Sequence, residues 1–412
     1  MAARRLVTAV LWFAAATQSA AASECGNLFG QRCRVALPTG VEMSYFDVGP
    51  VSGETLILLH TDTTSAVEWA WTVAALIKLD PELHVYAIDQ RGAGTTGLPR
   101  TEVCWTTPNR CIAQDDLAAD LLAFMDARHI PSATLVGHAL GAGVARNVAL
   151  SHPERVRRIV ISGIGVPPPS RPSDASAASP NAAPPARRRT GLEALGWQQL
   201  LEARGVRWPE GALHMRPVDI DPDAVRHITE HWDISVIAAP EVVEMIAAQT
   251  AAESLATWGV LDPTPRPRDP PARLSELAVP ALVLWGSEDF YFDRASQERL
   301  IAELRRASAS HPGMYFYWKQ FGVRPAPASH DKHDADDIGH NLSWEAPGPL
   351  AAEIDSFIRT GAPTRDRYRS DAPGDIRHIL TEPGQAIIVS SRPDHPSASG
   401  ASSAPPASSP TH

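Results

Sequence analysis

Short apolar runs alternate with amphipathic segments along most of the chain. The apolar runs contain few polar positions, which is typical of strands buried on both faces of a sheet. They lie at Thr55–His60, His84–Asp89, Ala133–Gly137, Val156–Ser162, Ala281–Trp285 and Met314–Trp318. Between them, apolar residues recur every three to four positions, which predicts helices. These helices lie at Ser65–Leu79, Asp115–Ile130, Asp293–Arg306 and Trp344–Arg359.

Two segments near the start of the chain alternate apolar and polar residues instead. They are Cys33–Pro38 and Met43–Val48, on either side of a turn at Thr39 and Gly40, and they predict a pair of edge strands. Because strands and helices alternate beyond them, we expect an α/β fold. Its sheet should be mostly parallel and doubly wound, with helices on both faces.

The alternation stops between residues 164 and 275. Val166–Arg189 is rich in proline, serine and alanine and cannot bury a core. Helical patterns follow at Gly191–Ala203, Asp221–Trp232 and Pro240–Trp258. We expect a proline-rich insertion and a helical cap here. The tryptophans of this cap either line an apolar pocket or pack the cap against the core.

The remaining boundaries follow from composition. We expect the two parts of the sheet domain at residues 23–163 and 276–361, on either side of the insertion and cap. Residues 362–412 are dominated by proline, serine and charged residues, which predicts a low-complexity, largely disordered tail.

The N-terminus resembles a secretory signal. Residues 1–22 combine a positively charged start, the apolar run Leu6–Thr17 and small residues at 20–22, which predicts a cleaved signal peptide. An uncleaved anchor is the alternative. No apolar run is long enough for a comfortable membrane span. We therefore expect a secreted or periplasmic protein.

The four cysteines agree with export, and the net charge argues against one class of partner. The local pairings Cys25–Cys33 and Cys104–Cys111 are the easiest of the three possible disulfide connectivities. The net charge of −10 and the absence of a basic face argue against nucleic-acid binding as the main role. The sequence does not predict the oligomeric state.

The most informative stretch runs from Ala133 to Leu150. It predicts a short strand, a turn bracketed by Gly137 and Gly141, and a helix, which is the layout of the nucleophile elbow G-x-S-x-G. The central position of this elbow holds Ala139. Alanine has neither a lone pair nor a proton to give, so the motif is present without its usual nucleophile.

With its companion motifs, the chain resembles the α/β-hydrolase fold superfamily, as a capped member related to serine hydrolases. The motifs are Leu59-His60, the segment Asp89–Gly94, the elbow, the segment Gly286–Asp289 and Gly339-His340. The order of this superfamily is nucleophile, acid, histidine. The resemblance therefore implies a catalytic site of Ala139, Asp289 and His340, with an inactive residue at the nucleophile position.

The resemblance also implies an oxyanion region at His60, Thr61, Asp62 and Leu140. The superfamily usually has glycine after the histidine, and this chain has Thr61. Asp62 stands where an oxyanion-binding amide is expected. An inward-pointing carboxylate would repel a developing negative charge, and an outward-pointing one would have little effect. The sequence leaves both orientations open.

Three functions remain compatible with these residues. The first is an exported pseudoenzyme with weak or absent acyl hydrolysis that binds a small, largely apolar molecule between cap and core. The second is a cofactor-free enzyme using the His340–Asp289 dyad as a general base: a lyase, an oxygenase or a water-attack hydrolase. The third is an active hydrolase with a displaced nucleophile, for which Ser65 and Ser287 are candidates.

We expect neither a cofactor nor a metal. The histidines and aspartates of the loop Val323–Gly339 are a possible exception, because such a density of ligands can hold a divalent ion. A solvated acidic loop is the simpler interpretation.

Overall fold

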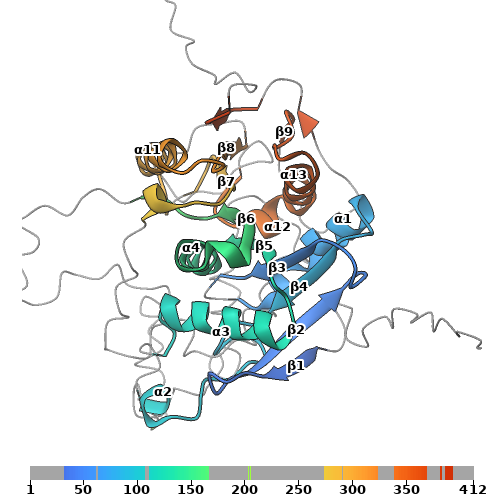
Figure 1. Ribbon diagram of the computed structural model, residues 1–412, viewed down its shortest axis with the longest axis vertical. Coiled ribbons are helices and arrows are strands. Elements are labelled where there is room, and N and C mark those ends of the chain that lie inside the picture. Colours follow the sequence, from blue (N-terminus) through green and yellow to red (C-terminus); the bar gives the residue numbers. More distant parts are fainter. Residues whose placement is uncertain are drawn as a thin grey trace, which may run out of the picture.

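The computed structural model describes residues 32–61, 64–106, 111–166, 203, 205, 273–289, 291–322, 338–368, 381–382 and 386–392. Nine strands of this part of the chain form one sheet, in the order β1-β2-β4-β3-β5-β6-β7-β8-β11. The pairs from β4 through β8 are parallel, whereas β1, β2 and β11 join antiparallel. The predicted α/β fold with a mostly parallel sheet is confirmed (Figure 1).

The strands begin and end close to the apolar runs of the sequence. Their bounds are β1 Cys33–Ala36, β2 Glu42–Val48, β3 Thr55–Leu59, β4 His84–Ile88, β5 Ala133–His138, β6 Val156–Ser162, β7 Ala281–Gly286, β8 Phe316–Phe321 and β11 Ile388–Ser390. A separate pair is formed by β9 Arg367–Tyr368 and β10 Thr381–Glu382.

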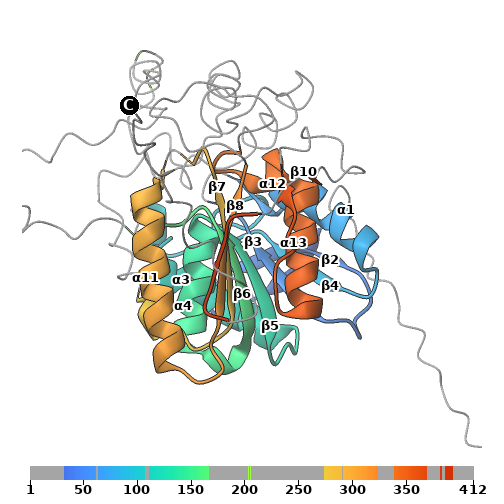
Figure 2. The same cartoon turned by 90° about the horizontal axis from the view of Figure 1, so that it is seen from above.

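Helices cover both faces of the sheet, as Figure 2 shows. α3 (Gln114–Ala127), α4 (Leu140–Ser151) and α11 (Arg294–Ser310) lie on one face; α1 (Ala70–Leu79), α12 (Leu342–Glu345) and α13 (Pro347–Thr360) lie on the other. The shorter pieces are α2 Glu102–Thr106 and the 3₁₀ turns η1 Ala66–Trp69, η3 Pro153–Arg155 and η6 Leu274–Glu276. The doubly wound arrangement leaves the strands β4, β5, β7 and β8 buried throughout, whereas the edge strand β1 is partly exposed.

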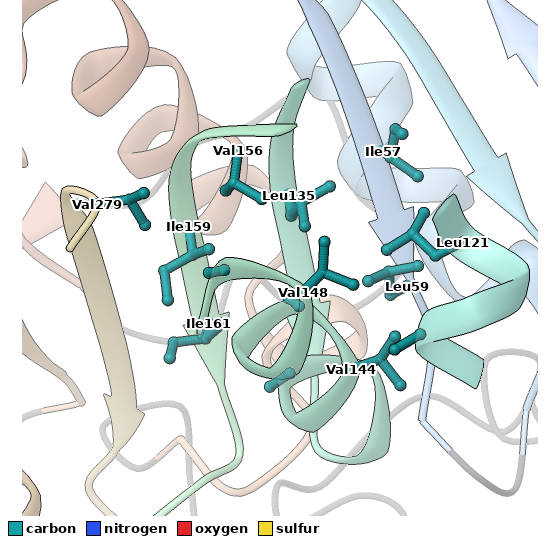
Figure 3. Packing of buried hydrophobic residues seen from close by; sticks show 14 of the residues in the cluster. Ile57, Leu59, Leu121, Leu135, Val144, Val148, Val156, Ile159, Ile161 and Val279 are labelled. Carbon is teal, nitrogen blue, oxygen red and sulfur yellow. The ribbon is translucent and has the colours of Figure 1, made fainter. Parts of the chain in front are cut away.

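The two faces of β5 show why its sequence is apolar throughout. Leu135 packs into the cluster under α3 and α4, and Val136 packs into the cluster on the opposite face. Figure 3 shows Leu135 beside Val148 of α4, with Ile57 and Ile159 from the neighbouring strands. Burying each such side chain contributes about 1.5–3 kcal/mol, so this packing holds the end of β5 firmly.

Some predicted boundaries need correction. β8 begins two residues later and ends three residues later than the predicted strand Met314–Trp318. The predicted helix Trp344–Arg359 is divided into α12 and α13, because Ala346 adopts a non-helical backbone conformation just before Pro347. The helix α2 was not predicted.

The segment 362–412, expected to be largely disordered, contains ordered parts. β11 pairs with β8 and extends the main sheet, and Tyr368 is buried against Phe321. The apolar residues that allow this are few and scattered, so composition alone hides them. The rest of this segment lies outside the described residues.

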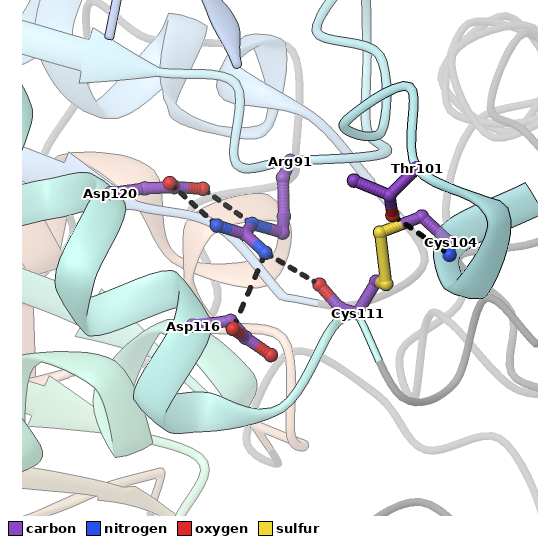
Figure 4. Close-up of a disulfide and its surroundings, with 6 residues drawn as sticks. All are labelled: Arg91, Thr101, Cys104, Cys111, Asp116 and Asp120. Carbon is purple, nitrogen blue, oxygen red and sulfur yellow. Dashed lines mark hydrogen bonds and ion pairs between the residues drawn. A yellow bond between two sulfur atoms is a disulfide. The ribbon is translucent and has the colours of Figure 1, made fainter. Parts of the chain in front are cut away.

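A disulfide and an arginine secure the loops beyond β4. Cys104 and Cys111 are bonded, which confirms that predicted pairing. In Figure 4, Arg91 lies between this bridge and α3: its Nη1 donates to the Cys111 carbonyl at 3.0 Å, and its Nε and Nη2 contact the two oxygens of Asp120. Cys33 is also disulfide-bonded, and its predicted partner Cys25 lies outside the described residues.

Several predictions fall outside the described residues. They are the signal peptide at 1–22, nearly all of the insertion and cap, and most of the loop 323–339. Among the residues that are described, no helix is both long and apolar enough to cross a membrane.

Candidate functional site

The turn between β5 and α4 has the backbone of a strained elbow. Ala139 adopts φ 47° and ψ −108°, and within the described chain only His129 shares a positive φ among non-glycine residues. Such a conformation costs about 1–3 kcal/mol for a residue with a Cβ. The surrounding structure must therefore hold it in place.

The two glycines of the motif make this turn possible. A Cβ on Gly141 would lie 2.1 Å from the Leu59 carbonyl oxygen, and one on Gly137 would lie 2.5 Å from the Gly141 carbonyl oxygen. The amide of Ala139 donates to the Ser162 carbonyl at 3.0 Å, and its own carbonyl accepts from Gly143 at 3.1 Å. The elbow is thus retained in full, with a methyl group at its apex.

His340 and Asp289 meet, as the sequence predicted. His340 Nδ1 lies 3.1 Å from Asp289 Oδ2, and both side chains are buried. Asp289 Oδ1 accepts from the amides of Tyr291 and Phe292, at 2.9 and 3.1 Å. Because an ionised carboxylate can only accept, His340 carries a hydrogen on Nδ1, and Nε2 is the basic atom of the neutral ring.

The end of β7 anchors the loop that carries His340. The Glu288 amide donates to the Ile338 carbonyl at 2.9 Å. A Cβ on Gly286 would lie 1.9 Å from the Gly339 carbonyl oxygen, so the two segments touch along their backbones. The Gly339 amide donates to Glu345 Oε2 of α12 at 2.8 Å. His340 is therefore positioned by β7 and α12 together.

A second histidine–carboxylate pair lies beside the first, and sequence reasoning missed it. His138 Nδ1, at the end of β5, lies 2.8 Å from Glu68 Oε1 of η1. The His138 ring lies 5.0 Å from the His340 ring, centroid to centroid. The buried Nε2 atom of His138 has no hydrogen-bond partner among the described residues. The elbow motif pointed to His138, but nothing in the sequence linked it to Glu68.

Glu68 is a fully buried hub of hydrogen bonds. It accepts from the Thr61 amide at 3.0 Å, the Thr64 hydroxyl at 2.6 Å and the Ser343 hydroxyl at 3.0 Å, in addition to His138. Burial alone would raise the pKa of Glu68. The charge that His138 carries when it is protonated and the hydrogen bonds from His138, Thr64 and Thr61 outweigh it and lower the pKa to about 2. Glu68 is therefore ionised at neutral pH.

In the predicted oxyanion region, the polar atoms of His60 and Thr61 form hydrogen bonds within the protein that hold this loop in place. His60 Nε2 accepts from the Gln90 amide at 3.0 Å, and His60 Nδ1 faces the Thr61 carbonyl, so both ring nitrogens have partners. The Thr61 amide is directed to Glu68. Leu140 is the first residue of α4, where a backbone amide has no partner within its own helix. Asp62 lies outside the described residues.

The two candidates for a displaced nucleophile lie in structural positions. Ser287 is fully buried, and its hydroxyl lies 3.5 Å from the Ile338 amide, which donates to it. Ser65 is buried at the start of η1, where its carbonyl accepts from the Glu68 amide. Within the described ranges, no group of three or more histidine, cysteine or acidic side chains could hold a metal ion.

Comparison with known proteins finds matches over the first part of the sheet. The family model described as alpha/beta hydrolase fold matches residues 54–191. The 2-hydroxymuconate semialdehyde hydrolase of a Pseudomonas species is 30% identical over 130 residues, which is 32% of this chain and 42% of that protein. The bifunctional epoxide hydrolase 2 of Rattus norvegicus is 28% identical over 136 residues, 33% of this chain and 23% of that protein. The chain thus spans less than half the length of these relatives.

Solved structures extend the likeness beyond that segment. A membrane phospholipase A, titled a bacterial virulence factor, superposes with a TM-score of 0.52 and 19% identity, over 80% of this chain and 85% of that one. The meta-cleavage product hydrolase of Pseudomonas fluorescens, a serine-to-alanine mutant complexed with acetates, superposes with a TM-score of 0.51 and 21% identity. The superposition covers 80% of this chain and 98% of that one. At these identities the likeness concerns the fold. Sheet order, elbow and the match over residues 54–191 agree: the chain has the α/β-hydrolase fold.

Proposed function

We propose that this protein has lost covalent acyl hydrolysis and binds a small, largely apolar molecule above the elbow. The observation that carries the proposal is Ala139, which occupies the apex of an intact, strained elbow. The residue before it, His138, has its ring 5.0 Å from the ring of His340, which is paired with Asp289. Removing the nucleophile of a serine hydrolase costs on the order of a millionfold in turnover. A covalent route is therefore closed at this position.

The relatives support the choice of a small ligand. Their names refer to a semialdehyde, a carbamate and an epoxide as substrates. The meta-cleavage product hydrolase with alanine in place of a serine was solved with acetates. A hydrolase scaffold with such a replacement is thus compatible with a bound small molecule, which is the role we propose here.

The test compares the full-length wild-type protein with Ala139→Ser on p-nitrophenyl acetate, butyrate and octanoate. The proposal expects no turnover above buffer in the wild type and measurable turnover in Ala139→Ser. The matched control is the double variant Ala139→Ser/His340→Gln, which keeps the new hydroxyl without its base and should be inactive. Calorimetric binding of p-nitrophenyl butyrate to the wild type, with a Kd near the KM of Ala139→Ser, completes the expected result. Wild-type turnover as fast as that of Ala139→Ser would refute the proposal.

A second function is favoured by one specific contact. The 3.1 Å bond between His340 and Asp289 orients an imidazole that can take a proton from water or from a substrate without an acyl-enzyme. We expect such a cofactor-free enzyme to show wild-type turnover that falls at least a hundredfold in His340→Gln. Turnover that survives His340→Gln but falls in Ser65→Ala or Ser287→Ala would point to a displaced nucleophile instead.

A further inference from the structure

Two buried carboxylate–imidazole pairs meet at the candidate site. His340 is held through Nδ1 by Asp289, and His138 is held through Nδ1 by Glu68. The carboxylates come from different elements, since Asp289 follows β7 and Glu68 lies in η1. Each imidazole is therefore fixed at one nitrogen, and the two rings lie next to each other with their centroids 5.0 Å apart.

Gly163 shows how closely the two rings approach. A Cβ on this residue would lie 2.8 Å from a ring carbon of His138 and equally close to one of His340. Any side chain at this position would therefore push the rings apart. Gly163 follows β6 with a φ of 64°, which glycine adopts without strain. The chain thus leaves room for a direct contact between the imidazoles.

The charge state of Glu68 bears on both rings. Because Glu68 is ionised and accepts only, His138 carries a hydrogen on Nδ1. Adding a second proton at the buried Nε2 of His138 creates a cation that Glu68 stabilises directly. Such a cation lies about 5 Å from His340, and at an effective dielectric constant near 20 two unit charges at that separation repel each other by about 3 kcal/mol, which corresponds to about two pH units.

Other titratable groups surround the pair on several elements. Glu288, Asp289 and Tyr291 follow β7, and Glu345 of α12 accepts from the Gly339 and Asn341 amides beside His340. In its ionised form, each of these groups carries a negative charge, which favours the protonated ring of His340. His138 differs from these described neighbours of His340, because its protonation adds a positive charge, which disfavours the protonated ring of His340.

We propose that Glu68 and His138 form a positioning pair for His340: when His138 is protonated beside Glu68, its charge keeps His340 neutral, so that the two rings share a single proton. The neutral form is the one in which His340 acts as a base. The inference deepens the proposed function by assigning a regulator to the same site. It concerns the resting protein and requires neither ligand nor turnover.

The experiment follows the ring C–H signals of full-length protein labelled at the histidine Cε1 carbons, by NMR between pH 4 and 9. His340→Gln and His138→Asn assign the two signals by their disappearance. In the wild type, we expect two coupled steps separated by at least one pH unit. In His138→Asn, whose amide can still donate to Glu68, we expect the midpoint of His340 to rise by about two units.

Two further variants separate this coupling from a general loss of charge. Glu68→Gln should lower the midpoint of His138 and raise that of His340. Glu345→Gln also removes a buried negative charge but should lower the midpoint of His340 or leave it unchanged. The proposal is overturned if the wild-type signals titrate independently, or if the midpoint of His340 is the same in His138→Asn and wild type. The ester assays decide the proposed function separately.

Discussion

Each end of the central sheet holds a buried histidine against an aspartate. At the carboxyl end of β7, His340 Nδ1 lies 3.1 Å from Asp289 Oδ2; at the amino end of β4, His84 Nε2 lies 2.8 Å from Asp47 Oδ1. The second contact is the shorter one, and both pairs are almost completely buried. Neither distance nor burial therefore distinguishes a candidate active site from a structural pair.

The surroundings of the two pairs do differ. His84 and Asp47 belong to regular strands, and Asp47 Oδ2 also lies 3.7 Å from the Arg128 guanidinium, which packs over the Tyr45 ring. His340 and Asp289 belong to loops at the carboxyl ends of parallel strands, where α/β proteins place their ligands. The His340 ring also lies 5.0 Å from that of His138, the residue before the strained Ala139. Position on the sheet and backbone strain are therefore more informative than the contact itself.

The largest predicted effect separates the pairs by stability. Asp47→Ala leaves the buried His84 and the partly exposed Arg128 without their carboxylate, so we expect a loss of about 2–4 kcal/mol in the free energy of unfolding. Asp289→Ala should lower the free energy of unfolding by less. The amides that lose their acceptor are those of Tyr291 and Phe292, and Tyr291 is exposed, so these amides can reach water. Urea denaturation followed by tryptophan fluorescence measures both. Equal losses in the two variants would mean that the pair beside the elbow is as structural as the other.

The next largest predicted effect is the loss of stability in acid that comes from Glu68, at the end of the sheet that carries the elbow. The pKa of Glu68 is lowered from its ordinary value to about 2, so the folded state binds its proton less readily than the unfolded state. The resulting stability is present above about pH 4.5 and is lost as the pH falls through about 2, and it amounts to about 3 kcal/mol. Glu68→Gln removes this contribution.

Comparing the two proteins at each pH isolates that contribution from other acids. The difference in unfolding free energy between wild type and Glu68→Gln should shrink by about 2–3 kcal/mol between pH 5 and pH 2. Asp47→Asn serves as the control at the other end of the sheet. If the wild type and Glu68→Gln lose stability in parallel over this range, then Glu68 is not held as an anion and the elbow end has no special acid sensitivity.

Much of the framework was predictable from the sequence, because it depends on local patterns. The continuous apolar runs gave the buried strands, and the alternating segments around Gly40 gave the antiparallel pair β1 and β2. The spacing of Gly137 and Gly141 gave the elbow, because only residues without a Cβ fit there. Asp289 and His340 could be paired because they lie in the motifs Gly286–Asp289 and Gly339-His340, whose order along the chain matches that of the superfamily.

The missed features depend on contacts between distant segments. Glu68 falls on a predicted helix, where the hydrophobic period indicates a buried face without saying what an acid on that face would contact. Its partners His138 and Ser343 lie 70 and 275 residues away. His60 was assigned to the oxyanion region, yet its two nitrogens hold Gln90 and Thr61. A sequence motif marks such a residue without revealing how its polar atoms are used.

The smallest predicted effect tests the strain itself. Ala139 and His129 are the two non-glycine residues with positive φ in the described chain, and they lie towards opposite ends of the sheet. At His129, φ is 55° directly after α3, a place where glycine commonly ends a helix. We expect His129→Gly to stabilise the protein by no more than about 0.5 kcal/mol, because the left-handed helical region is only mildly costly there.

Ala139 is in a less favourable region, since its ψ of −108° lies outside the left-handed helical basin. Glycine relieves this strain but also increases the entropy of the unfolded chain, and the two effects leave a net gain of about 1 kcal/mol for Ala139→Gly. Thermal unfolding at several scan rates compares the two glycine variants. A gain at Ala139 that exceeds the gain at His129 would mean that the protein still bears the cost of a nucleophile elbow, although its apex now carries a methyl group. A loss of stability at Ala139 would instead mean that the methyl group packs well enough to outweigh the strain, and the elbow would then be a structural turn like the one after α3.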